Sequence, residues 1–153
     1  MNAEQQNVTV SIVMPVHNGL HYLRKSLPAL LTHRSEHLLE VLVVDDGSTD
    51  GSGDFARSCG ARVISSGGHL GPAAARNMAV REARSPVVLF VDADVVVHPD
   101  TVDRVIRAFP GQETVAVFGS YDDSPADRGF SSLYMNLRHH EIHQQSSDDA
   151  QTF

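Results

Sequence analysis

Two acidic clusters in the sequence each follow a short apolar run. Asp45-Asp46 follow residues 41–44, and Asp92-Ala93-Asp94 follow residues 87–91. A strand covered on both faces of a sheet is almost continuously hydrophobic, so carboxylates that follow it must lie just outside the sheet. Two such strand ends in one parallel sheet can direct up to four carboxylates into one crevice. This arrangement favours a phosphate ligand that is chelated by a divalent metal ion.

The second cluster has the spacing of a metal-binding turn. Asp92 and Asp94 are two residues apart, and in an extended segment such residues point the same way. Both carboxylates can therefore reach one ion, and Mg²⁺ or Mn²⁺ would neutralise a diphosphate and help it leave. An acidic turn with a helix-capping aspartate is the alternative. Because the pair directly follows a buried strand, we favour metal binding.

The first cluster opens a longer polar segment, residues 45–50. Gly47 permits a turn, and Ser48, Thr49 or Asp50 can cap the helix that follows. These roles do not explain the two acids that close the strand. Their carboxylates can accept hydrogen bonds from N–H or hydroxyl groups of a ligand, although helix capping remains an alternative.

A possible anion site follows at residues 71–77. The segment opens with Gly71-Pro72, where proline fits the first position of a helix. The free N–H groups and the dipole of such a helix favour an anion, and the Arg76 guanidinium can bind a phosphate. A surface arginine without a ligand is the alternative. The G-x-G-x-x-G and Walker A patterns are both absent from the sequence.

Strand-like and helix-like segments alternate along the chain, which is typical of an α/β fold with a mostly parallel sheet flanked by helices on both faces. We predict strands at residues 8–14, 40–45, 61–65, 87–92 and 114–119. We predict helices at residues 19–33, 52–59, 72–84, 100–108 and 130–145. Right-handed crossovers place the carboxyl ends of all these strands at one edge, where ligands bind in open α/β sheets.

Composition narrows the class of protein. The 153 residues are enough for one domain with a real core, and the net charge of −7 argues against nucleic-acid binding. Cys59 is the only cysteine, so no intrachain disulfide can form. Residues 1–7 are polar and lack the pattern of a signal peptide, and the apolar runs are too short to span a bilayer. We expect a cytoplasmic protein, or a domain at the cytoplasmic face of a membrane within a longer parent protein.

Histidine and cysteine residues offer two further candidate sites. His139, His140 and His143 cluster, and the first and third share a helical face. No H-E-x-x-H motif accompanies them, so a solvated helix face is the favoured interpretation. No base can be assigned to Cys59, which favours a small apolar side chain over a nucleophile.

Four motifs in order give the chain a family resemblance. It resembles the family 2 glycosyltransferases in residues 10–18 (VSIVMPVHN), 43–50 (VVDDGSTD), 71–77 (GPAAARN) and 92–94 (DAD). The motifs cover residues 8–120, essentially the nucleotide-binding half of the GT-A fold. The resemblance implies a UDP- or GDP-sugar donor and transfer of the sugar with inversion at its anomeric carbon.

The resemblance also implies roles for particular residues. Nucleotide-binding roles are implied for Pro15, Val16, Asn18, Asp45, Asp46, Arg76 and Asp92. The segment around Pro15 and Val16 would line the base pocket. Asp94 would coordinate Mg²⁺ or Mn²⁺ bridging the diphosphate, and Asp92 would contact the ribose or the metal shell.

The C-terminal third departs from the family pattern. Family members use a later carboxylate to deprotonate the acceptor hydroxyl, and no such motif occurs before Phe153. We therefore expect a polar tail at residues 1–7, a nucleotide-sugar-binding core at 8–120 and an incomplete acceptor-side region at 121–153. On this interpretation the chain is a truncated domain whose catalytic base lies beyond Phe153, and its acceptor is unknown.

Two other functions compete with this interpretation. Residues 89–96 resemble the nucleophile strand of haloacid-dehalogenase-type phosphatases, but that motif normally lies on the first strand with a lysine downstream. Here it lies on the fourth predicted strand, and the single lysine, Lys25, precedes it. The second alternative is a non-catalytic module that binds a nucleotide sugar or a partner. In that case the apolar face of the helix at 130–145 could serve self-association.

Overall fold

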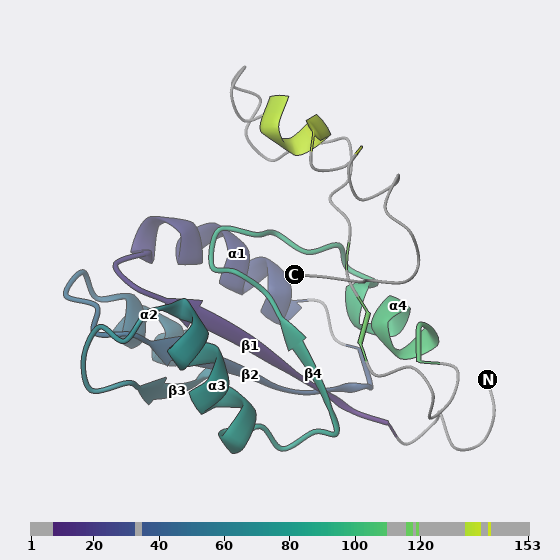
Figure 1. The fold of residues 1–153 in the computed structure, drawn as a ribbon, viewed down its shortest axis with the longest axis horizontal. Coiled ribbons are helices and arrows are strands. Elements are labelled where there is room, and N and C mark those ends of the chain that lie inside the picture. The colour runs from purple at the N-terminus through teal and green to yellow at the C-terminus, as the bar shows by residue number, and fades with distance from the viewer. Residues whose placement is uncertain are drawn as a thin grey trace. The chain divides into compact units, whose positions relative to one another are not determined.

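The computed structural model describes residues 8–32, 35–109, 116–117, 119, 134–138 and 141. The chain divides into two compact units, Met1–Val115 and Ala116–Phe153. In the first unit, strands and helices alternate (Figure 1), in the order β1 (Val10–Val16), α1 (Leu20–Thr32), β2 (Leu38–Asp45), α2 (Ser52–Ser58), β3 (Arg62–Ser65), α3 (Pro72–Glu82), β4 (Val87–Phe90) and α4 (Thr101–Arg107). In the second unit, residues 134–138 and 141 are helical.

The described strands form one parallel sheet with the order β3-β2-β1-β4. Ile12 of β1 pairs with Val41 of β2 on one side and with Leu89 of β4 on the other. The chain winds outward from β1 to β3 and then returns to place β4 on the opposite side of β1. Such a reversal of strand order opens a crevice at the carboxyl ends of the strands. The topology therefore puts the crevice beside the ends of β1 and β4.

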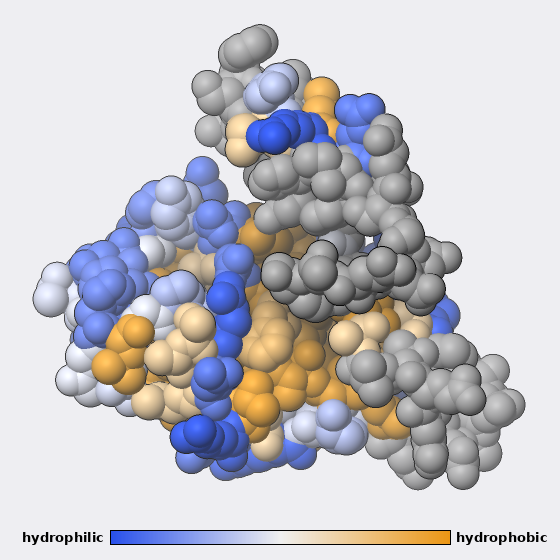
Figure 2. Space-filling model, viewed as in Figure 1, coloured by the Kyte–Doolittle hydropathy of each residue, from blue (hydrophilic) through white to orange (hydrophobic). Residues whose placement is uncertain are grey.

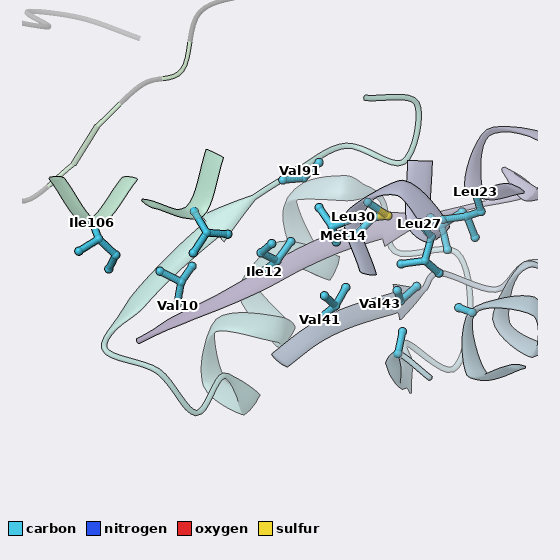
Figure 3. Close-up of a cluster of buried hydrophobic side chains, with 14 residues drawn as sticks. Val10, Ile12, Met14, Leu23, Leu27, Leu30, Val41, Val43, Val91 and Ile106 are labelled. Atoms are coloured by element: carbon cyan, nitrogen blue, oxygen red, sulfur yellow. The ribbon is translucent and has the colours of Figure 1, made fainter. Parts of the chain in front are cut away.

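The larger core cluster lies on the face of the sheet that α1 covers (Figure 3). Alternate residues of a strand point to the same face, and alternate residues of β1 and β2 enter this cluster with leucines of α1: Val10, Ile12, Met14, Leu23, Leu27, Leu30, Val41 and Val43. Ala56 of α2 and Val102 and Ile106 of α4 join them. Each of these side chains is at most 7% exposed. Residues of α1, α2 and α4 thus pack on one face of the sheet.

The opposite face of the sheet is covered by α3. Val13, Leu42 and Val44 pack there against Ala75 and Ala79, whose short side chains let the helix lie close to the strands. The cover is partial: Figure 2 shows apolar surface between α3 and β4, and Phe90 of β4 remains 46% exposed.

The predicted fold class is confirmed, and the first four predicted strands and helices are present with shifted ends. The strand predicted at 8–14 continues to Val16 because Pro15 and Val16 extend the ladder with β2. The strand predicted at 87–92 ends at Phe90, which leaves both motif acids in the following turn.

The remaining predictions concern the last third of the chain. Of the fifth predicted strand, only residues 116, 117 and 119 are described, and none of them is in a strand. The helix predicted at 130–145 is helical where it is described, and Tyr134, Met135 and Leu137 are exposed there. Self-association through that helix and the domain boundary at residue 120 stay predictions, and the histidines at 139, 140 and 143 lie outside the described residues. Within the described part of the chain, no helix is long and apolar enough to cross a membrane.

Candidate functional site

A cavity of about 320 Å³ lies at the carboxyl end of β1. The segments that follow β2, β3 and β4 contribute to it, together with the first turns of α3. Its lining residues are Pro15, Val16, His17, Asp46, His69, Pro72, Arg76, Asp92 and Asp94. The cavity thus occupies the crevice that the strand order predicts.

Six of the eight predicted site residues line this cavity, all except Asn18 and Asp45. Their binding roles stay predictions. Sequence analysis missed His17 and His69, which also line it. His17 could have been found, since it lies between Val16 and Asn18 in a quoted motif, whereas His69 carries no signal beyond its place before a helix.

The turn after β4 is held by its backbone while its carboxylates remain exposed. The Ser26 hydroxyl of α1 donates to the Ala93 carbonyl over 2.6 Å, and the Val95 N–H donates to the Asp92 carbonyl over 3.0 Å. The side chain of Asp92 is 54% exposed and forms an ion pair with Arg76. Asp94 is exposed. The turn thus presents two acids on a fixed backbone.

Asp46 is placed very differently, because its carboxylate serves the chain's own backbone. It is 2% exposed, and its two oxygens accept the N–H groups of Leu70 and Gly71 over 2.9 and 2.8 Å. His69 Nδ1 lies 3.1 Å from the same carboxylate. Burial by itself would raise the pKa of this carboxyl, but the hydrogen bonds and the nearby histidine outweigh burial and lower it. Asp46 therefore stays ionised and fixes the start of α3, the helix that carries Arg76.

Two imidazole rings in contact, tilted relative to each other, form the wall of the cavity beside Asp46. The ring centroids of His17 and His69 are 4.0 Å apart, with 35° between the ring planes. His17 Nδ1 lies 2.7 Å from the Asp46 carbonyl, which can only accept, so this nitrogen carries the proton. His17 Nε2 then accepts from the Asn18 side-chain amide over 3.1 Å. This tautomer makes His17 part of the frame of the site.

Asn18 connects the β1–α1 turn to the loop after β2. Its backbone is left-handed, with φ of 49°, a conformation that asparagine tolerates better than most residues. Its side-chain oxygen accepts the Thr49 N–H over 2.8 Å, and its own N–H donates to the Ser48 hydroxyl over 3.0 Å. Asn18 thus ties two loops together outside the cavity.

Asp50 joins the starts of two helices. One carboxylate oxygen accepts the N–H of Ser52, the first residue of α2, over 3.0 Å. The other accepts the N–H of Leu20, the first residue of α1, over 2.9 Å. Burial would raise the pKa of Asp50, but these bonds and the Ser52 hydroxyl outweigh it and lower the pKa. The N-cap residue of α2 is Gly51, so none of residues 48–50 is the cap itself. Asp50, one residue earlier, instead accepts the first N–H of α2 and the first N–H of α1.

Asp45 faces α2 rather than the cavity. One of its carboxylate oxygens accepts the Ser48 N–H over 3.0 Å. The other lies where a side chain at Gly53 would start, because a Cβ added there would be 2.2 Å from it. Gly53 is therefore required by the position of this carboxylate.

The two acids after β4 fit a divalent cation that a ligand helps to hold. No three histidine, cysteine, aspartate or glutamate side chains converge on a metal position among the residues described. Mg²⁺ commonly takes one or two carboxylates and completes its shell with substrate phosphates and water. Asp92 and Asp94 supply such a pair at the cavity wall.

The chain matches the family model of Glycosyl transferase family 2 over residues 11–152. An uncharacterized glycosyltransferase of Haemophilus influenzae is 28% identical over 117 residues, which are 73% of this chain and 46% of that relative. The chain therefore spans less than half the length of this relative.

Solved structures show the same similarity. Staphylococcus aureus TarS, residues 1–349, in complex with UDP-GlcNAc is similar with a TM-score of 0.58 and 28% identity, over 65% of this chain and 30% of that one. The mannosyltransferase PcManGT of Pyrobaculum calidifontis in complex with GDP-Man and Mn²⁺ gives a TM-score of 0.61 and 25% identity, over 67% and 32%. These neighbours have the GT-A fold. With its parallel sheet and the family match over nearly its whole length, the chain belongs to glycosyl transferase family 2.

Proposed function

We propose that this chain binds a nucleoside-diphosphate sugar with Mg²⁺ or Mn²⁺ in the cavity at the end of β1, for transfer of the sugar to an acceptor hydroxyl with inversion. The observation that carries the proposal is the meeting of Asp92, Asp94 and Arg76 at one cavity wall. A pair of carboxylates and a guanidinium are the groups that a metal-bound diphosphate needs. The UDP-GlcNAc, GDP-Man and Mn²⁺ held by the similar structures support it.

The lining residues divide into those that would touch the donor and those that position them. Asp94 and Asp92 would hold the cation, which supplies neutralisation of the diphosphate charge when bound. Arg76 would bind the diphosphate, and Pro15 and Val16 would form the wall for the nucleoside. Their places around one cavity support these roles.

Three of the predicted residues are better described as positioning residues. We propose that Asp46 acts through its hold on the start of α3. We propose that Asn18 and Asp45 act through the loops that they tie together. A donor could hydrogen-bond to Asp46 only through a lone pair of the carboxylate that its internal partners leave unused.

Transfer needs a general base for the acceptor hydroxyl. As the acceptor oxygen bonds to the anomeric carbon, the bond from that carbon to the diphosphate breaks, and the acceptor proton passes to the base. No described residue of the cavity is assigned this role. Transfer activity is therefore part of the proposal, and the acceptor and the catalytic base are not assigned.

The test is calorimetric titration of the chain with UDP-GlcNAc and GDP-mannose, with and without Mn²⁺. We expect Mn²⁺ to increase the affinity of the chain for one of these nucleotide sugars. Asp94→Ala should reduce this Mn²⁺-dependent increase at least about tenfold, because the variant lacks a metal ligand. Asp54→Ala is the matched control, since this exposed acid of α2 lies outside the cavity lining and pairs with Arg57 at the surface. The proposal fails if neither nucleotide sugar binds, or if Asp94→Ala leaves the metal dependence unchanged.

Assays of the same purified chain also distinguish the two alternative functions. Turnover of a bound donor, by hydrolysis or transfer, would argue against a non-catalytic binding module, whereas binding without turnover would favour it. Hydrolysis of a generic phosphomonoester without nucleotide binding would favour the phosphatase. The family match supports the glycosyltransferase interpretation over both.

A further inference from the structure

We propose that Arg76 is a switch side chain: it holds Asp92 while the cavity is empty, and it moves to the donor's diphosphate when a divalent cation takes that carboxylate. Cation and donor would then bind cooperatively, because each frees a group that the other needs. This inference rests on the proposed function of the cavity.

The contact that carries the inference is an ion pair inside the cavity wall. Nη2 of Arg76 donates a hydrogen bond to Oδ1 of Asp92, and both residues line the cavity. The second motif acid differs, since Asp94 makes no hydrogen bond or ion pair with any residue that the structure describes. Among the described residues, Arg76 therefore neutralises one of the two motif acids, and the other has no internal partner.

The ion pair engages one nitrogen of the Arg76 guanidinium and one oxygen of the Asp92 carboxylate. A guanidinium matches either a carboxylate or a phosphate with its fork of N–H groups. While Arg76 occupies an oxygen of Asp92, that oxygen is not free for a cation, and the positive charge beside it repels one. The internal pair is thus a competitor of both ligands.

The ion pair between Arg76 and Asp92 is weak enough for a cation and a diphosphate to displace it. The side chains of Arg76 and Asp92 are 33% and 54% exposed, and ion pairs in contact with solvent contribute a factor of only about 1.5 to 5 to an equilibrium. Ligands at ordinary concentrations can therefore displace it. A buried pair would instead exclude the cation from Asp92.

The backbone on both sides of the pair is fixed, so the exchange requires only side-chain movement. Asp46 holds the start of α3 through the N–H groups of Leu70 and Gly71. On the other side, Ser26 of α1 holds the carbonyl of Ala93 in the turn after β4. Rotamer changes of exposed side chains are fast, so the switch would not limit donor binding.

Removal of Arg76 should change the affinities for cation and donor in opposite directions. If Arg76 competes with the cation, its removal must tighten cation binding to the nucleotide-free protein. If Arg76 also binds the diphosphate, its removal must weaken donor binding when the cation is present. The factor by which the cation improves donor affinity must then fall, and by reciprocity so must the effect of the donor on the cation.

The experiment is a titration of Mn²⁺ against the nucleotide-free chain, with free Mn²⁺ measured by electron paramagnetic resonance, in wild type and Arg76→Gln. We expect Arg76→Gln to bind Mn²⁺ about 2- to 5-fold more tightly. We expect the same variant to bind the nucleotide sugar about tenfold more weakly at saturating Mn²⁺, the loss of one charge-assisted contact. Arg81→Gln is the control for net charge, since Arg81 is exposed on the same helix.

Each outcome decides between the two proposals. Unchanged or weaker Mn²⁺ binding in Arg76→Gln overturns the switch, and so does equal tightening in Arg81→Gln, which would show a general charge effect. If the wild type binds neither UDP-GlcNAc nor GDP-mannose, the proposed function fails. The nucleotide-free titration does not depend on the donor and still decides whether Arg76 competes with the cation.

Discussion

The acids that follow β2 and those that follow β4 look alike in the sequence but occupy opposite environments. Asp46 is 2% exposed, and its carboxylate is used by two backbone N–H groups. The side chain of Asp92 is 54% exposed, and it forms an ion pair with the Arg76 side chain in the cavity wall. The first cluster builds the frame of the site, and the second is available to a ligand.

The difference follows from where each strand lies in the sheet. β2 is between β3 and β1, so the segments after it are surrounded by chain, whereas β4 is at the edge of the described sheet. A carboxylate in a crowded position must find internal hydrogen bonds, because burying it without them is costly. A carboxylate at an edge can remain solvated. Strand position thus separates a positioning acid from a ligand-binding acid.

The largest effect on stability is expected for Asp46→Ala. This change leaves the Leu70 and Gly71 N–H groups without their acceptor, and we expect it to lower the free energy of unfolding by about 3 kcal/mol. Urea unfolding measures it, with Asp54→Ala as an exposed control. A loss below about 0.5 kcal/mol, the range of ordinary surface substitutions, would mean that Asp46 is not a frame residue.

The next prediction tests whether the Asp45 carboxylate packs against Gly53 of α2. Gly53→Ala would place a Cβ 2.2 Å from the Asp45 carboxylate, and we expect a loss of about 1–3 kcal/mol from overpacking. Asp45→Ala in the same chain removes the clash, so the double variant should lose less than the sum of the two single variants. Additive losses in urea unfolding would contradict this placement.

The contribution of the Asp46 and Asp50 carboxylates to stability should depend on pH. The pKa values of Asp46 and Asp50 are lowered in the folded chain. Their contribution to the free energy of unfolding is therefore complete above the pKa of an aspartate in the unfolded chain, about 4, and is lost as the pH falls through the pKa values of the folded chain. We expect the free energy of unfolding to decline below about pH 4. Asp50→Asn should flatten that decline, and an unchanged slope would show that Asp50 does not contribute.

The smallest stability effect is expected at the other cluster. Asp92→Asn removes only a partly exposed ion pair with Arg76, and we expect a change within about 0.5 kcal/mol. Its effect should appear instead in Mn²⁺ binding. A loss of stability as large as that of Asp46→Ala would remove the distinction between the two clusters.

Much of the fold followed from patterns in the sequence. Apolar runs at 41–44 and 87–91 marked two strands of the sheet, and the alternation of elements predicted its parallel arrangement. Pro72 marked the first residue of α3 correctly. The end of β1 was placed two residues too early, since pairing with β2 carries the strand on to Val16.

The site was only partly predictable because its residues act through long-range contacts. His69 and Asp46 are 23 positions apart in the sequence and meet through the loop before α3. Asp50 serves α1 as well as α2, which no local capping rule indicates. Consecutive residues of a strand point to opposite sides, a signal that could have separated Asp45 from Asp46.

The sequence by itself determined the spacing of the chemical groups: two acids in a row after β2, two acids separated by one alanine after β4, and an arginine in the second turn of α3. Only the tertiary structure decided which of these acids is buried and which faces the cavity. That choice depends on the order of the strands and on which helix covers each face. Local patterns indicate to which side of a strand a side chain points. The burial and the partners of a carboxylate depend on chain segments that are distant in the sequence.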